Sequence, residues 1–338
     1  MFRSVVRATV ATVATVETQI SNAVAVAVEG VATVKARKAR AVLAKAPRKA
    51  PVAKARKAPV AKAPRKARHN AAPLDFSGLK LTQWARDVIA QDPEFFAVWP
   101  RNILRLDGNA KTVKGNDIGF ATAILYMIPA DGATEQNLCA LAVLARCKAP
   151  CLVSSGRGAF ASVAKARLRK TLAFLSDPAR FMRQIHEELI GMRREAARMG
   201  ATLLVRLNGT SDIRFENYAF DGFDNIFIAN PDVQFYDYTK LSNRKNITSN
   251  YDLTFSYSGA PEFAPHVARA VAAGMRLAVV FRTRKIVERM LTNGEQFQGL
   301  ALVDGDDNDV RHIDPAGCVV ALYAKGKARQ DQSGFVVG

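Results

Sequence analysis

The chain has 338 residues, with 49 Lys and Arg against 30 Asp and Glu and a formal net charge of +19. No run of about 18 apolar residues occurs, so the sequence predicts no membrane span. Four cysteines are too few for a disulfide framework, and Glu17 and Gln19 interrupt the apolar N-terminal stretch, which argues against a secretory signal.

The positive charge is concentrated at the N-terminus. Residues 1–74 hold 16 Lys and Arg and 2 acidic residues, a net of +14, whereas the remaining 264 residues hold 33 and 28, a net of +5. The motif Ala50–Lys57 is nearly repeated by Ala58–Lys66, and no aromatic residue lies between Phe2 and Phe76. Such a segment buries too little apolar surface to offset the entropy of ordering it, so we expect a disordered basic tail over 1–74 and one α/β domain over 75–338.

Spaced cations on a flexible chain suit the neutralisation of phosphates without sequence reading. The tail therefore predicts sequence-independent nucleic-acid binding; a solubilising linker is the alternative. The candidate nucleic-acid-binding residues are Lys54, Arg56, Lys57, Arg65 and Lys66.

The body alternates strand-like and helix-like patterns. The apolar run Ile118–Ile128 predicts a first core strand, and Ser162–Leu175 predicts a helix. Asp177 and Pro178 then supply the cap and first turn of a second helix, which we expect to end at Gly200. Six short β-like segments follow: Leu203–Leu207, Val233–Tyr238, Leu253–Tyr257, Leu277–Phe281, Leu300–Val303 and Val319–Leu322. This order favours a mainly parallel sheet or a partial TIM-like barrel.

Polar side chains follow the strand-like runs directly. In parallel α/β sheets and barrels the carboxyl ends of the strands form the functional face, so these groups are expected to meet at one rim. The alternative is that polar residues end strands because loops are polar. The candidate catalytic residues are Arg206, Asn208, Asp212, Asp237 and Lys240.

Three cysteines, Cys139, Cys147 and Cys151, lie within thirteen residues in the loop after the first predicted strand. Thiolates so close together are typical of a metal centre, either an iron–sulfur cluster or zinc with a distant histidine or Cys318 as fourth ligand. Three unligated thiols that pack a loop are the other possibility. Cys318 opens an apolar run and is expected to face the core.

A glycine-rich turn follows the cysteines. Backbone amides and the guanidinium in Ser155, Gly156, Arg157 and Gly158 could together bind a phosphate or carboxylate, although a plain helix-start turn explains the same residues. The cations next to it, Lys165, Arg167, Arg169 and Lys170, favour a polyanion-binding surface.

An acidic turn occurs near the C-terminus, with Asp304, Asp306, Asp307 and Asp309. It lacks the glutamate of an EF-hand loop, so a solvated hairpin is the preferred interpretation over a cation site.

Several multi-residue motifs resemble the gene-product-88 family of phage and mobile-element proteins. They include Asn137–Cys139, Ser155–Gly158, Val205–Asp212, Pro231–Lys240 and the ending Ala324–Arg329. The resemblance covers about residues 75–338 and implies a phage-encoded protein that acts in the bacterial cytoplasm.

A cysteine loop after the first strand of a parallel barrel also resembles, more distantly, the radical S-adenosylmethionine enzymes. That resemblance implies an iron–sulfur cluster with S-adenosylmethionine as cofactor. The cysteine spacers here are seven and three residues, where that family has three and two. Two functional classes follow: a metal- or cluster-dependent enzyme, or a DNA-binding or packaging protein with a structural cysteine loop.

Overall fold

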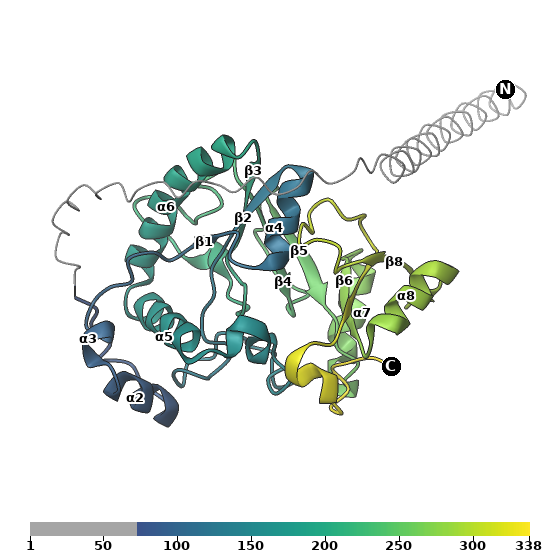
Figure 1. Ribbon diagram of the computed structural model, residues 1–338, viewed down its shortest axis with the longest axis horizontal. Helices are drawn as coiled ribbons and strands as arrows, with labels where there is room; N and C mark the ends of the chain where they lie inside the picture. Colours follow the sequence, from purple (N-terminus) through teal and green to yellow (C-terminus); the bar gives the residue numbers. More distant parts are fainter. Residues whose placement is uncertain (1–72) are drawn as a thin grey trace, which may run out of the picture. The chain divides into compact units, whose positions relative to one another are not determined.

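The computed structural model describes residues 73–338 (Figure 1). The predicted basic tail, with all five of its candidate nucleic-acid-binding residues, lies outside the described residues except for Pro73 and Leu74. Over the part of the chain that is described, no helix is long and apolar enough to span a bilayer.

A nine-stranded sheet forms the centre of the fold. Its seven inner strands are parallel, and the two edge strands, β1 and β7, pair antiparallel with their neighbours. In spatial order the strands are β1 (Arg105–Leu106), β2 (Phe120–Ile124), β3 (Thr202–Arg206), β4 (Gln234–Thr239), β5 (Tyr251–Ser256), β6 (Leu277–Phe281), β9 (Val319–Tyr323), β8 (Leu300–Asp304) and β7 (Gln296–Phe297).

The prediction of an α/β fold with a mainly parallel sheet is confirmed. The barrel alternative is not, because the strand order has two ends and no pairing among residues 73–338 joins β1 to β7. Each predicted strand is present. The first is shorter than Ile118–Ile128, because the 3₁₀ helix η1 (Lys114–Ile118) precedes it and ends at Gly119, whose φ is +84°.

The predicted helices are also present, as α5 (Ala161–Ser176) and α6 (Pro178–Arg198). The Asp177 carboxylate accepts a hydrogen bond from the amide of Arg180 at 2.9 Å and caps α6, as expected for Asp before Pro at a helix start. The remaining α-helices were not predicted from the sequence: α2 (Gln83–Ala90), α3 (Pro93–Phe96), α4 (Ala110–Val113), α7 (Ala264–Ala272) and α8 (Arg284–Asn293).

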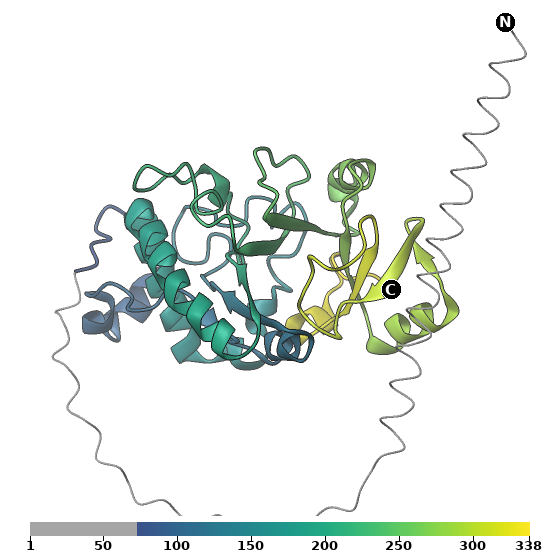
Figure 2. The ribbon, with the colours of Figure 1, turned by 90° about the horizontal axis from the view of Figure 1, so that it is seen from above.

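Four helices, α5 to α8, cover one face of the sheet in two groups. Apolar residues of β2, β3 and β4 form one core with α5 and α6, and those of β5, β6 and β9 form a second core with α7 and α8. Figure 1 shows α5 and α6 beside the first parallel strands and α7 and α8 beside the last, and Figure 2 shows α2 and α3 (blue) at the end far from α8.

The irregular segment 305–318 packs on the opposite face. Val310 lies against Leu204 and Tyr236, and Cys318 lies against Ala278. Cys318 is buried, so the prediction that it faces the core is confirmed.

Candidate functional site

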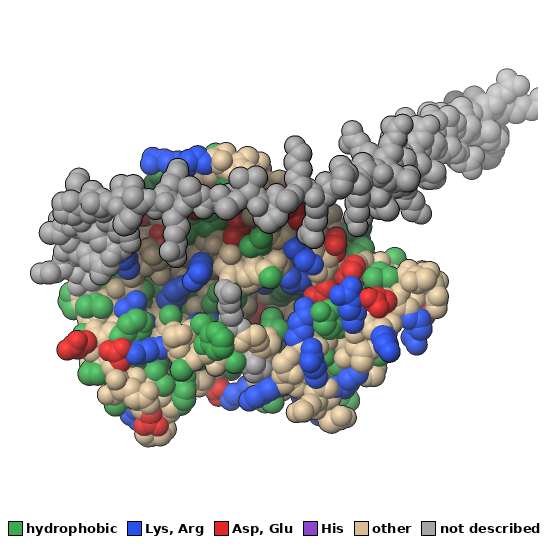
Figure 3. All heavy atoms as spheres, viewed as in Figure 1, with side chains coloured by type: hydrophobic (Ala, Val, Ile, Leu, Met, Phe, Trp, Pro, Cys, Tyr) green, Lys and Arg blue, Asp and Glu red, His purple; other side chains and the backbone are tan. Residues whose placement is uncertain are grey.

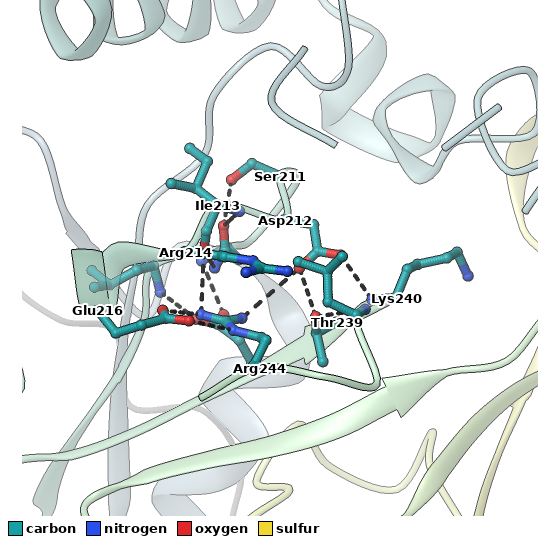
Figure 4. A network of polar contacts seen from close by, with 12 residues as sticks. Ser211, Asp212, Ile213, Arg214, Glu216, Thr239, Lys240 and Arg244 are labelled. Carbon is teal, nitrogen blue, oxygen red and sulfur yellow. Dashed lines mark hydrogen bonds and ion pairs between the residues drawn. The ribbon is translucent and has the colours of Figure 1, made fainter. Parts of the chain in front are cut away.

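The carboxyl ends of β3 and β4 are tied together by Asp212. Its side chain, 8% exposed, accepts hydrogen bonds from the Thr239 hydroxyl at 2.8 Å and from the Lys240 amide at 2.7 Å. Burial raises the pKa of Asp212, and these bonds and the nearby cations oppose that rise. Two of the candidate catalytic residues, Asp212 and Lys240, are therefore joined directly (Figure 4).

The Lys240 side chain points away from Asp212 in Figure 4 and reaches the end of β5. Its Nζ donates to the Ser256 carbonyl at 2.8 Å, to the Ser256 hydroxyl at 2.9 Å and to the Tyr257 carbonyl at 3.3 Å. The rings of Phe263 and Phe335 lie within 5.4 Å of the ammonium. Because burial disfavours the charged form, the pKa of Lys240 is lowered.

The three cysteines lie beside this lysine. They are close enough that ionisation of any of the three thiols, or of Asp212, raises the pKa of Lys240. Ser258 fixes the segment that carries them, because its hydroxyl donates to the Ala145 carbonyl at 2.8 Å. The fold therefore gathers Cys139, Cys147, Cys151, Asp212 and Lys240 at one rim.

All three thiols are partly buried and reduced. Burial raises the pKa of Cys139 to about 12 and also raises the pKa of Cys147 and Cys151. The Cys139 sulfur accepts from the Ala130 amide at 3.3 Å and donates to the Thr210 carbonyl at 3.8 Å. Burial therefore favours the neutral thiol over the thiolate at all three positions.

The donor set fits a soft metal in kind but not in its positions. Within residues 73–338, no three His, Cys, Asp or Glu side chains are arranged so that they could hold one ion. A metal on the three cysteines would require the loop that carries them to rearrange, so no property of the site described above depends on a bound metal.

The remaining candidate catalytic residues are placed differently. Asp237, buried below the rim, accepts from the amides of Leu207 at 3.2 Å and Asn208 at 3.0 Å and from the Tyr251 hydroxyl at 3.2 Å. Burial raises the pKa of Asp237 to about 6. The Asn208 side chain holds the turn after β3 by donating to the Ile213 carbonyl at 3.0 Å.

Arg206 belongs to the face covered by segment 305–318. Its Nη1 donates to Asp309 Oδ2 at 2.6 Å, and the two side chains are 9% and 6% exposed. Burial pushes the pKa of Asp309 up, but the cations of Arg206, Lys111 and Arg311 hold it below its usual value. The interpretation of the acidic turn as a solvated hairpin is wrong for Asp309, because the partner 103 residues away in sequence is not visible in a local pattern.

Two residues of the network in Figure 4 were missed by the sequence analysis. Arg244 and Glu216 form an ion pair whose side chains are 2% and 1% exposed, and Arg244 also lies 3.9 Å from Asp212. Neither residue follows a strand-like run or belongs to a short motif, so no local signal marks them.

The glycine-rich turn is a compact local structure. The Ser155 hydroxyl and amide both donate to the Leu152 carbonyl, at 2.8 and 3.0 Å, and the Gly158 amide donates to the Ser155 carbonyl at 3.1 Å. A Cβ on Gly158 would lie 2.8 Å from the Val153 carbonyl oxygen. The side chain of Arg157 lies outside what the structure describes, so ligand binding at this turn stays a prediction.

Three of the cations predicted to form a polyanion surface on α5 make internal contacts instead. Lys165 pairs with Asp92, Arg169 stacks 3.8 Å from the Phe95 ring, and Lys170 donates to the Ile103 carbonyl at 2.5 Å. Their role in the fold is to fix α3 and the segment after it onto α5.

Comparison with known proteins gives one positive result. The family model described as Gene product 88 matches residues 102–338. No curated protein and no solved structure gives a significant match.

Proposed function

Since the chain belongs to the gene product 88 family of phage-type proteins, we propose that it is an enzyme whose reaction takes place at the rim formed by the carboxyl ends of β3, β4 and β5. The observation that carries the proposal is the gathering of three thiols around the buried Lys240 and Asp212. Groups with shifted pKa values at the strand ends of a parallel sheet are typical of active sites.

The thiols are the groups that we expect to bind a cofactor. Burial holds them in the neutral form, and a bound metal ion would favour the thiolates that soft metals require. Between Ala130 and Phe160 the described regular structure consists of two short 3₁₀ helices, η2 (Leu152–Ser154) and η3 (Gly156–Ala159). Rearranging this loop onto a metal would therefore displace no strand and no long helix.

Two metal centres are consistent with three cysteines. An iron–sulfur cluster with S-adenosylmethionine is favoured by the position of the loop after the first parallel strand, β2. Zinc is the alternative, and it needs a fourth ligand from elsewhere. An iron–sulfur cluster bound there would supply redox chemistry. The ammonium of Lys240 and the carboxylate of Asp212 would place a positive and a negative charge beside the reacting groups.

Metal analysis and an ultraviolet–visible spectrum of the anaerobically purified protein test the proposal. Stoichiometric iron and sulfide with visible charge-transfer absorption would support the cluster, and zinc without such absorption would support the second form. Protein that contains no metal after anaerobic purification would refute the metal-dependent enzyme and favour a binding protein with structural cysteines.

We further propose that residues 1–74 bind nucleic acid without sequence preference, in the cytoplasm of the bacterial host. The support is the net charge of +14 (16 cations and 2 acidic residues) in this segment, which includes Lys54, Arg56, Lys57, Arg65 and Lys66. Deletion of residues 1–74 should remove most of a salt-sensitive affinity for DNA. Equal affinity with and without the tail would contradict this role.

A further inference from the structure

Two long segments of the body contain cations but no carboxylates. Residues 136–176, which carry the three cysteines, hold 7 Lys and Arg and no Asp or Glu. Residues 315–330 hold Lys325, Lys327 and Arg329 and again no Asp or Glu. Since the body as a whole has nearly balanced charges, this separation indicates a surface that faces an anion.

The fold places these two segments against each other. The 3₁₀ helix η2 of the cysteine segment packs on η6 (Gly326–Gln330) of the C-terminal segment. Arg146 Nη1 donates to the Ser333 carbonyl at 3.1 Å, and the Ser333 hydroxyl donates back to the Arg146 carbonyl at 3.2 Å. In Figure 3, Lys and Arg side chains gather around the place that the C-terminal segment (yellow) occupies in Figure 1.

Four cations of the two segments remain accessible there. The side chains of Arg146 and Lys148 are 41% and 50% exposed although they pair with Glu262 and Asp131, and Lys327 and Arg329 on η6 are exposed. Together with the exposed Leu152 and Phe160 of the cysteine segment, these four residues form what we call the rim surface.

Large apolar side chains project from the same cysteine segment. Phe160 is 59% exposed and Leu152 is 60% exposed, although both lie next to well-packed parts of the fold. Phe160 directly precedes α5, where it takes the cap position without a side-chain hydrogen bond to the helix. Phe160 directly follows η3, which packs on η2, and η2 packs on η6, so a chain of contacts joins the ring to the cations of η6. Exposed aromatic rings and cations on one surface are the combination that binds single-stranded nucleic acids, because bases stack on the ring while phosphates contact the cations.

We propose that the rim surface binds single-stranded nucleic acid, with a base stacked on Phe160 and phosphates at Lys148, Lys327 and Arg329. A paired duplex buries its base faces and offers no ring to Phe160, so a single strand fits the surface better. If the thiol site is the active site proposed above, single-stranded nucleic acid is its substrate class, and in this respect the inference rests on the proposed function. The binding itself does not require a metal.

Fluorescence anisotropy of the full-length protein with a labelled oligothymidylate tests the proposal. For Phe160→Ala we expect a loss in affinity of about fivefold to a hundredfold, because stacking on an aromatic side chain has roughly that effect per base. For the double variant Lys327→Gln/Arg329→Gln, the slope of log K against log salt concentration should fall in magnitude by about 1.4, or about 0.7 for each phosphate that a cation no longer neutralises.

Matched controls come from exposed residues on or beside α6. Phe223 is a partly exposed ring, and Arg194 and Arg198 are exposed cations spaced one turn apart. Phe223→Ala and Arg194→Gln/Arg198→Gln should leave the affinity and the salt slope close to those of the unmodified protein. Because every variant keeps residues 1–74, the contribution of the tail is the same in all of them.

Three results would overturn the inference. They are an unchanged affinity for the oligothymidylate in Phe160→Ala, equal changes of the salt slope in the two double variants, and a loss of affinity in Phe160→Ala that is as large for duplex DNA as for the single strand. The outcome is independent of the metal analysis. If the protein contains no metal but shows the expected losses of affinity, the binding surface is supported and the metalloenzyme is refuted. If it contains metal and shows no such losses, the metalloenzyme is supported and the binding surface is refuted.

Discussion

The carboxylate of Asp212 accepts a hydrogen bond from the backbone amide of Lys240 at 2.7 Å, and this contact joins the segment after β3 to the end of β4. The other carboxylate oxygen accepts a hydrogen bond from the Thr239 hydroxyl at 2.8 Å. Asp212 thereby fixes the residue whose ammonium lies next to the three thiols.

Replacement of Asp212 by Asn should lower the free energy of unfolding by about 1–3 kcal/mol, since Asn keeps only one acceptor oxygen and one of the two buried donors then faces an NH2 group. Urea denaturation measures the change. Asp307→Asn is the control, because Asp307 is exposed. Equal stabilities of the two variants would show that Asp212 does not hold the rim.

The buried pair Glu216–Arg244 should be costly to break from one side. Glu216→Gln removes the carboxylate that Arg244 contacts directly and leaves only Asp212, at 3.9 Å, as a nearby anion. We expect a loss of about 3–5 kcal/mol in the free energy of unfolding. The double variant Glu216→Leu/Arg244→Met should lose less stability than the sum of the losses in Glu216→Leu and in Arg244→Met. Additive losses in a double-mutant cycle would contradict a direct interaction between the two side chains.

Segment 305–318 should loosen when its buried anchor is removed. Asp309→Asn takes the charge from the contact with Arg206, so the amides of this segment should exchange with deuterium faster than in the unmodified protein. A loss of about 3–5 kcal/mol in the free energy of unfolding should accompany the faster exchange. If exchange accelerates equally in α6, which Asp309 does not anchor, the effect is global and the anchoring role is wrong.

Lys170 should make the protein more stable at alkaline pH. Burial lowers the pKa of Lys170 to about 8, against 10.5 for an unperturbed lysine. Between these values the folded protein has lost the proton and the unfolded chain retains it, so stability rises with pH, by at most about 1.4 kcal/mol per pH unit. Below pH 8 the cost of burying the ammonium is fully present.

The comparison with Lys170→Met isolates this contribution from that of the thiols, which lose their protons within this interval in the unfolded chain. The difference in unfolding free energy between the two proteins should change in favour of the unmodified protein from pH 8 to 10.5. A difference that stays constant across this interval would show that Lys170 is not charged and buried as described.

The sequence predicted the framework of the fold well, because its signals are local. Asp177 and Pro178 mark the start of α6, and the short apolar runs mark the inner strands. The strand-end rule also placed Asp212 and Lys240 at one rim with the cysteines, since neighbouring parallel strands end side by side.

The sequence could not divide the polar residues among the layers of the structure. Arg206 and Asp237 both follow the rule for strand ends, and Arg206 Nε lies 3.9 Å from Asp237 Oδ1. Their hydrogen-bond partners differ, because Arg206 donates to Asp309 in segment 305–318, whereas Asp237 accepts bonds from the turn after β3. Partners so distant in sequence leave no periodic signal. The cations of α5 were misinterpreted for the same reason, because Asp92 and Phe95 lie about 70 residues before Lys165 and Arg169.

The most direct test of the central claim is the metal content of two cysteine variants purified anaerobically. Cys147→Ala removes a rim thiol, whereas Cys318→Ala removes the buried thiol that packs against Ala278 beneath segment 305–318. The account predicts that metal is lost from Cys147→Ala and retained at the level of the unmodified protein in Cys318→Ala. Equal metal content in both variants, or none in the unmodified protein, would contradict a metal centre on Cys139, Cys147 and Cys151.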